Sequence, residues 1–132
     1  MSDSQRPSNL TQATRAGRVI LAFLWVYQGV VPKLLGPDAD ELAMNLALGV
    51  SATVAWQISM VAGVVEIAIG LCVLLVRRAW PLWLTLVLMA GLLGYVALLT
   101  PQLMSAAFNP VTINVAMAGL AWMVLLIEPP PR

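Results

Sequence analysis

The chain has 132 residues, of which 61% are hydrophobic and 10% are charged. A soluble domain of this size has too much surface for its volume to bury so many apolar side chains. The composition therefore excludes a soluble domain and indicates a single integral membrane domain. The formal net charge of +1 gives no reason to expect a nucleic acid or an acidic protein as a partner.

Four apolar runs predict four membrane-spanning helices, because a helix needs about 20 residues to cross the hydrocarbon layer. The predicted fold class is therefore all-α, a four-helix transmembrane bundle of up-down topology. The expected parts are a polar cytoplasmic tail over 1–16, a membrane domain over 17–128 with spans at about 18–35, 54–76, 80–100 and 110–127, and a C-terminal tail over 129–132.

The first run reaches the required length if its helix continues through Pro32. Proline removes a backbone donor and crowds the carbonyl four residues back, so Pro32 is expected either to kink the helix or to end it. Arg15 and Arg18 precede the run as basic residues precede a signal peptide, but the stretch YQGVVPK offers no small-residue cleavage site. We therefore expect a retained first span.

The basic residues indicate the orientation, because cytoplasmic loops favour Lys and Arg. With the N-terminus inside, Lys33 lies outside and the other basic residues lie inside: Arg6, Arg15, Arg18, Arg77, Arg78 and Arg132. Both termini are therefore expected in the cytoplasm.

The stretch GPDADELAMNLALG, between the first two runs, predicts a short interfacial helix over about 39–48. Asp38 stands three residues before Glu41, which is the spacing of a capping box with Asp as the cap. Gly49 is a natural C-terminal stop. Such a helix either covers the surface of the bundle or forms a lid over a site.

Glu66 is the charged residue of the second run and lies near mid-membrane, roughly 18 Å past Val54 at about 1.5 Å per residue. A carboxyl at that depth is costly unless it faces the bundle interior and is protonated, paired or hydrated. A face of small residues on the same run allows another helix to approach closely: Ser59, Ala62, Gly63 and Gly70. Ala90 and Gly94 have the same spacing on the third run.

The candidate ligand site is built from Glu66 and seven further polar residues. Tyr27 or Gln28, at similar depth in the first run, is expected to donate a hydrogen bond to Glu66. A second group is expected nearer the outer side, with a Lys33–Glu41 ion pair among its members: Lys33, Glu41, Tyr95, Asn109 and Asn114. Purely structural roles stay open, with Glu66 and Asn114 joining helices and Lys33 snorkelling to the interface.

Missing residue types narrow the chemistry. The chain has no histidine and one cysteine, which excludes bis-His haem ligation, ordinary zinc or iron catalysis and an intrachain dithiol mechanism. It has no phosphate-cradling glycine loop and no Ser-His pair. We therefore expect no metal site, no covalently bound cofactor, no catalytic residues and no independent catalytic activity.

Three segments, LWVYQGVVPKLLGPDADELAMNLALGV, AGVVEIAIG and PQLMSAAFNPVTIN, resemble the DoxX-like integral membrane family over about residues 18–126. The pattern has five parts in chain order: Trp25, Tyr27 and Gly29; Pro32 and Lys33; Glu41; Glu66; then Phe108, Pro110 and Asn114. Two positions depart from it, since Asn109 and Ile113 stand where relatives carry a glycine and a lysine. If that lysine binds an anionic group in the relatives, this chain does not share the activity that depends on it.

The resemblance implies a multi-pass inner (plasma) membrane protein, and some relatives are associated with quinone-linked oxidoreductases such as thiosulfate:quinone oxidoreductase. The first hypothesis is a membrane anchor or quinone-site subunit of an oxidoreductase complex. Tyr27, Lys33 and Glu66 would supply hydrogen bonds and a proton to the quinone, and a partner would supply electrons. Two others stay open. One is a non-enzymatic assembly or interaction protein, and the other is a small lipid-binding or transport protein, which would work as a homo-oligomer.

Overall fold

The computed structural model describes residues 6–107 and 109–128, so the motif residue Phe108 lies outside the described residues. The described elements are α1 (Arg6–Gly29), a π-helical turn η1 (Val30–Leu34), α2 (Ala39–Leu46), α3 (Ala52–Leu75), α4 (Trp80–Leu99), a 3-10 helix η2 (Pro101–Ser105) and α5 (Pro110–Ile127). The all-α prediction is therefore confirmed over these ranges.

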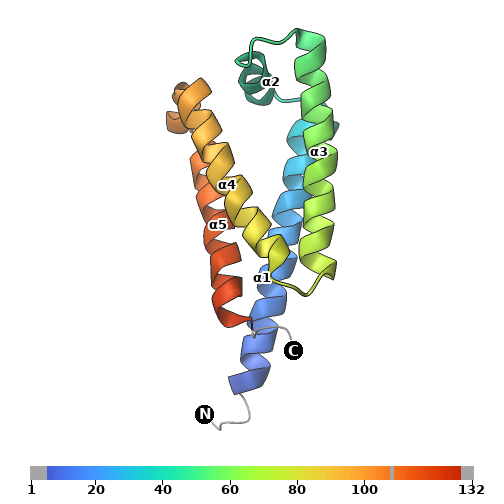
Figure 1. Cartoon of the computed structure of the whole chain (residues 1–132), viewed down its shortest axis with the longest axis vertical. Helices are drawn as coiled ribbons and strands as arrows, with labels where there is room; N and C mark the ends of the chain where they lie inside the picture. The colour runs from blue at the N-terminus through green and yellow to red at the C-terminus, as the bar shows by residue number, and fades with distance from the viewer. Residues whose placement is uncertain (1–5, 108, 129–132) are drawn as a thin grey trace.

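The long helices α1, α3, α4 and α5 run alternately up and down, and the start of α1 and the end of α5 lie at the same end of the molecule (Figure 1). α1 packs along α3, and α4 packs along α5. The two pairs meet mainly through α1 and α5, whereas α3 and α4 touch little. Toward the end that carries α2 the two pairs diverge (Figure 1).

Three helices, α3, α4 and α5, are each long and apolar enough to cross a membrane. The first helix meets that standard only together with α2, across a bend of 81°. Residues 19–32, between Arg18 and Lys33, span about 21 Å as a helix, which is short of the roughly 30 Å hydrocarbon core. The fourth span and the side on which the termini lie therefore stay predictions.

Large apolar side chains are exposed on the outer faces of the long helices, for example Val61, Leu98 and Leu126. Water-exposed apolar patches on this scale are unusual in soluble monomers, and lipid is the environment that suits them. α1 begins at Arg6, inside the segment 1–16 that we expected as a polar tail, so residues 6–16 of that segment are helical.

Pro32 lies inside the π-helical turn η1 and does not end the helix there. The Leu35 N–H donates to the Val30 carbonyl at 2.9 Å, a bond one residue longer than in an α-helix. This wider turn accommodates the proline ring, which would crowd a carbonyl of a regular helix. The chain then leaves the helix at Gly36, whose φ of +129° favours glycine.

α2 covers Ala39–Leu46, two residues shorter than predicted at its end. Asp38 is the N-cap as expected, and its carboxylate accepts from the Asp40 N–H at 2.9 Å. Glu41 does not complete a capping box, because its carboxylate pairs with Lys33 instead. Gly49 has a φ of +77° and ends the turn that follows the helix, so the helix itself stops at Leu46, before the predicted glycine.

A glycine contact sets the distance between α1 and α3. A Cβ on Gly29 would lie 2.5 Å from the Gly63 carbonyl oxygen, and a Cβ on Gly63 would lie 2.7 Å from the Gly29 carbonyl oxygen. The small-residue face predicted on α3 is therefore a helix contact. The equivalent face predicted on α4 is not used within the described residues, because Ala90 and Gly94 are exposed and a Cβ on Gly94 would meet no atom within 4 Å.

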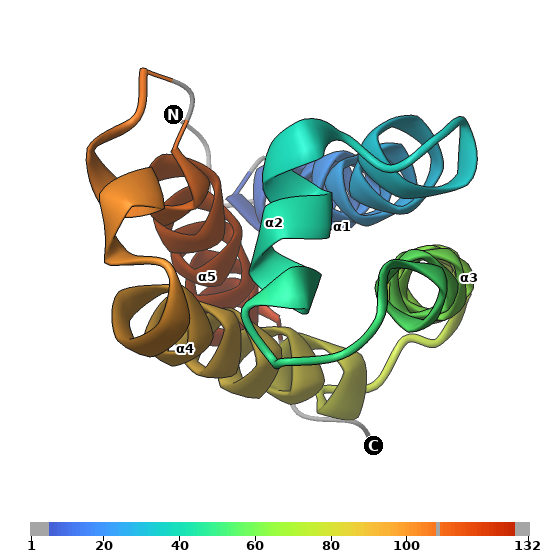
Figure 2. The ribbon, with the colours of Figure 1, turned by 90° about the horizontal axis from the view of Figure 1, so that it is seen from above.

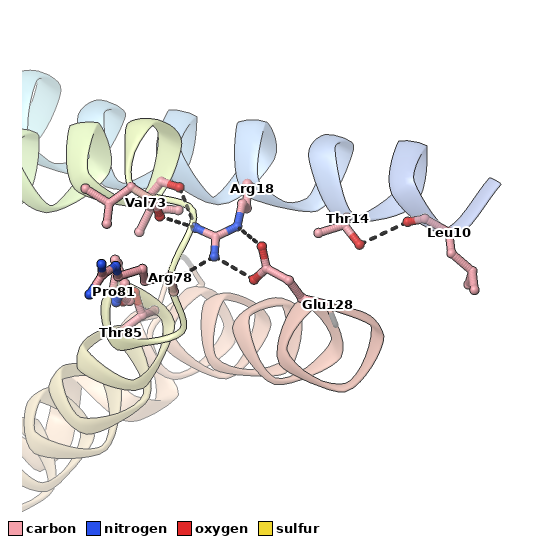
Figure 3. Close-up of polar contacts among 9 residues, drawn as sticks. Leu10, Thr14, Arg18, Val73, Arg78, Pro81, Thr85 and Glu128 are labelled. Carbon is pink, nitrogen blue, oxygen red and sulfur yellow. Dashed lines mark hydrogen bonds and ion pairs between the residues drawn. The ribbon is translucent and has the colours of Figure 1, made fainter. Parts of the chain in front are cut away.

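Arg18 of α1 bonds to the C-terminal ends of both α3 and α5 (Figure 3). Its Nε and Nη2 donate to Glu128 at 3.0 and 2.6 Å. Nη1 donates to the carbonyls of Val73 and Val76 at 2.8 and 3.0 Å, and Nη2 donates to that of Arg78 at 2.9 Å. The C-terminal end of a helix leaves such carbonyls without partners and attracts a cation. All five guanidinium donors are thus used, and α1, α3 and α5 are joined.

We predict that Arg18→Gln lowers the free energy of unfolding by about 3 kcal/mol, because it leaves Glu128 and three carbonyls without their charged partner. The measurement is SDS-induced unfolding of the purified protein in mixed micelles. Arg15→Gln is the matched control on the exposed side of α1 and should change the value by less than about 0.5 kcal/mol. Equal effects of the two variants would show that the hydrogen bonds of Arg18 do not stabilise the fold.

We predict that Gly63→Ala destabilises the protein by about 1–3 kcal/mol, because the added methyl meets the backbone of α1. Gly91→Ala is the control, since a Cβ on Gly91 meets nothing within 4 Å, and it should be neutral or slightly stabilising. The same SDS titration compares them. A Gly63→Ala variant as stable as Gly91→Ala would show that the α1–α3 contact is looser than described.

Candidate binding site

A cavity of about 790 Å³ lies between the α1–α3 pair and the α4–α5 pair. Figure 2 shows α2 lying across the end of the molecule above this space. The volume falls within the roughly 300–1,000 Å³ usual for small-molecule pockets. All eight residues proposed from the sequence line it: Tyr27, Gln28, Lys33, Glu41, Glu66, Tyr95, Asn109 and Asn114. Much of the remaining lining is apolar, including Ile58, Leu92 and Met117.

Lys33 is the electrostatic centre of the cavity. Its Nζ lies 3.2 Å from Glu41 Oε2 on α2 and 3.2 Å from Glu66 Oε1 on α3. The three side chains are 9%, 14% and 12% exposed, so the ion pairs are largely shielded from water. The predicted Lys33–Glu41 ion pair is present, and the alternative in which Lys33 snorkels outward does not describe this structure.

Helix geometry explains why Lys33 and Glu66 meet. The two residues flank the Gly29–Gly63 contact on antiparallel helices, with Lys33 on the α2 side and Glu66 on the opposite side. Side chains lean toward the N-terminus of their own helix. Lys33 therefore leans away from α2 and Glu66 leans toward it, so their charged ends converge.

The predicted donors to Glu66 are wrong. Neither Tyr27 nor Gln28 bonds to the Glu66 carboxylate within the described residues, because Lys33 takes that place. Tyr27 is 50% exposed, and its ring lies 5.9 Å from that of Phe23. Glu66 Oε2 is buried without a hydrogen-bond partner, so one half of this carboxylate is left unsatisfied.

Side-chain hydrogen bonds to α4 and to α3 hold α2 over the cavity. The Tyr95 hydroxyl of α4 donates to the Met44 carbonyl at 2.7 Å. The Asn45 side-chain amide donates to Ser59 Oγ at 2.7 Å, which ties α2 to α3. Asn45 is buried and also lines the cavity, but we did not predict it as a site residue. The signal in the sequence was an asparagine within the leucine-rich part of an otherwise amphipathic helix.

The two predicted asparagines differ in how they are bonded. Asn109 caps α5, since its Oδ1 accepts from the Thr112 N–H at 3.0 Å and its Nδ2 donates to the Ala106 carbonyl at 3.1 Å. Asn114 is buried beside the cavity and its side chain bonds to no other described residue. Asn114 and Gln28, which is also without a described partner, are therefore the amides that a ligand can engage.

Trp25 lines the same cavity and is 2% exposed. Its Nε1 donates to Thr85 Oγ1 at 3.1 Å, and that hydroxyl donates to the Pro81 carbonyl at 3.0 Å. This chain of bonds joins α1 to the start of α4. Trp25 therefore combines an apolar wall with a satisfied polar end, as buried tryptophans usually do.

Among the charged side chains that line the cavity, carboxylates outnumber ammonium groups by four to one. Asp38 and Asp40 join Glu41 and Glu66, and Lys33 is the cation. No group of three or more potential metal-binding residues occurs in the described part of the chain. The arrangement can hold a small amphiphile, with its polar end at Lys33 and its apolar part against the helix walls.

The residues that build this cavity fall within a recognised sequence family. A family model described as the DoxX-like family matches residues 22–122. The chain belongs to the DoxX-like family. Comparisons with curated proteins and with solved structures gave no match. The family and the apolar helices together indicate a membrane protein. The matched range contains all eight predicted site residues, whereas both members of the Arg18–Glu128 ion pair lie outside it.

We predict that Tyr95→Phe accelerates hydrogen exchange of the α2 backbone amides about fivefold, because it removes one hydrogen bond worth about 1 kcal/mol. Exchange is followed by mass spectrometry in detergent. Tyr27→Phe is the matched control, since the Tyr27 hydroxyl bonds to no other described residue. Unchanged exchange in Tyr95→Phe would mean that this bond does not hold α2 in place.

Proposed function

We propose that this DoxX-like chain is the quinone-binding membrane subunit of an oxidoreductase complex in the inner (plasma) membrane. The observation that supports this most is the cavity of about 790 Å³ beneath α2, with the Lys33 ion pairs inside it. An apolar cavity with a few convergent polar groups is the usual form of a small-molecule site.

The lining residues fit the chemistry of a quinone, which has two carbonyl acceptors on an apolar ring and tail. The Lys33 ammonium and the Gln28 and Asn114 amides are donors suited to carbonyl oxygens. The walls from α4 and α5, including Leu92 and Met117, suit the ring and the tail. A bound quinone would supply the capacity to accept electrons, and Glu66 would be the group beside it that can exchange a proton.

The electrons must come from another protein in this proposal. The chain has no histidine and one cysteine, Cys72, so it offers no ligand set for a redox metal and no dithiol. We therefore assign it the roles of anchor and binding site, and we assign electron supply to a partner.

The proposed orientation places both termini and the partner on the cytoplasmic side. Arg15, on α1, and Arg77 and Arg78, between α3 and α4, are exposed, whereas Asp38 and Asp40 lie at the start of α2, at the other end of α3. This separation of charge supports the orientation expected from the bias of cytoplasmic loops toward basic residues.

We predict that Ala62→Phe weakens binding of 2-decyl-1,4-benzoquinone at least tenfold, because the new ring occupies the cavity that Ala62 lines. Ala68→Phe is the control, since it adds the same ring to an exposed position of the same helix. Binding is measured by equilibrium dialysis in detergent. The fluorescence of Trp25, a wall of the cavity, gives a second readout that Trp25→Phe should abolish.

Binding measurements on the same purified protein also test the two remaining hypotheses, a lipid-binding or transport protein and an assembly protein. Saturable binding of phospholipid in place of the quinone would favour a lipid-binding or transport protein, and no saturable ligand at all would favour a purely assembly role. An oxidoreductase recovered with the chain in mild detergent should lose quinone reduction in Ala62→Phe and keep it in Ala68→Phe. Equal loss in both variants would contradict the quinone site.

A further inference from the structure

We infer that the cavity selects a neutral head group that donates hydrogen bonds, so that it binds the reduced, dihydroxy form of a quinone more tightly than the oxidised form. This inference rests on the proposed function, because it concerns the ligand of the same cavity. The inference is based on the charges and the hydrogen-bonding groups of the cavity lining, which favour a ligand with hydrogen-bond donors.

The charge of the lining disfavours anionic ligands. Four carboxylates and one ammonium group line the cavity: Asp38, Asp40, Glu41, Glu66 and Lys33. A phosphate or carboxylate head would meet this excess of negative charge, in which Glu41 and Glu66 are shielded from water whereas Asp38 and Asp40 are exposed, and the repulsion is strongest at the shielded pair. A second cation would have to compete with the Lys33 ammonium, which already lies 3.2 Å from both glutamates.

Acceptors exceed donors at the polar centre. Two ionised carboxylates offer four oxygens with about eight acceptor positions, whereas an ammonium group offers three donors. Lys33 reaches one oxygen of Glu41 and one of Glu66. Glu66 Oε2 is buried and has no partner, which leaves an acceptor unsatisfied where such a group is costly. A hydroxyl donor in the ligand would satisfy it.

The unsatisfied oxygen can reach the cavity by a small local motion. Oε2 is covered by neighbouring atoms, although the Glu66 side chain as a whole is 12% exposed and lines the cavity. Rotation about the last bond of a glutamate is broad and nearly two-fold. A half-turn would only exchange the two equivalent oxygens, but a partial turn within this broad range can direct the free oxygen toward a ligand hydroxyl while the other oxygen stays near Lys33.

The two redox forms of a quinone differ in the property that this lining distinguishes. The oxidised form has only acceptors, so it would use the Gln28 and Asn114 amides and a Lys33 ammonium that already lies beside two glutamates. The reduced form has the same ring and tail, but its two hydroxyls donate to acceptors that are in excess. A hydrogen bond to a charged acceptor contributes about 1.5–3 kcal/mol, so we expect at least a tenfold preference for the reduced form.

The test compares three probes of nearly the same shape on the purified full-length chain under argon. They are 2-decyl-1,4-hydroquinone, its dimethyl ether and 2-decyl-1,4-benzoquinone, with dissociation constants from equilibrium dialysis. The hydroquinone should bind at least tenfold more tightly than the other two. Equal binding of all three, or tighter binding of the quinone, would overturn the inference while leaving the quinone site intact. Absence of saturable binding by every probe would instead overturn the proposed function.

The matched variants are Glu66→Gln and Glu41→Gln, which remove the same charge at the same distance from the Lys33 ammonium. In Glu66→Gln the preference for hydroquinone over its dimethyl ether should fall to about twofold or less. In Glu41→Gln it should fall by less than in Glu66→Gln, because the free oxygen of Glu66 remains. Loss of the preference in both variants would mean that total charge, and not Glu66, sets the selectivity. The three-probe comparison on the unaltered chain tests the inference even if Glu66→Gln does not fold.

Discussion

The architecture of the cavity depends on one shared cation. Lys33 lies 3.2 Å from a carboxylate on α2 and 3.2 Å from a carboxylate on α3, so a single ammonium group joins three separate elements of the chain. Isolated glutamates at these shielded positions would be costly, and the lysine offsets that cost. The ion pairs also require the Gly29–Gly63 contact, because it brings the backbones of α1 and α3 close enough for side chains from both flanks to meet.

Arg18, near the middle of α1, and Lys33, in η1, are both buried cations, and the two have opposite consequences. The Arg18 guanidinium draws the ends of α3 and α5 together with five hydrogen bonds (Figure 3). At the other end, Lys33 binds α2 and α3 but has no described ion pair with α4 or α5. The helix pairs are therefore joined tightly at one end and diverge at the other, where α2 covers the cavity (Figures 1 and 2).

Short-range sequence patterns were enough to predict the helices, but the contacts between side chains of different helices depend on how those helices pack. The lengths of the apolar runs and the Asp38 cap follow from short-range chemistry, and both are present in the structure. The partner of Glu66 was predicted wrongly because depth along a helix says nothing of the direction in which a side chain leans. Small-residue spacing has a similar limit. It shows where a helix can be approached closely, and α1 does so at Gly63 while Gly94 stays open. Arg18 indicated orientation in the sequence, but its five acceptors come from segments that only the folded chain brings together.

The two positions that depart from the expected family pattern, Asn109 and Ile113, both line the cavity. Ile113 stands where the resemblance led us to expect a lysine. The amide of Asn109 is committed to the backbone at the start of α5. The cavity of this chain therefore keeps one lysine against four carboxylates, whereas a second lysine at position 113 would bring the balance closer to neutral. A site with that lysine would tolerate an anionic head group, and this one disfavours it. The charges on the cavity wall, more than the helices and α2, are therefore what would decide which head group this cavity accepts.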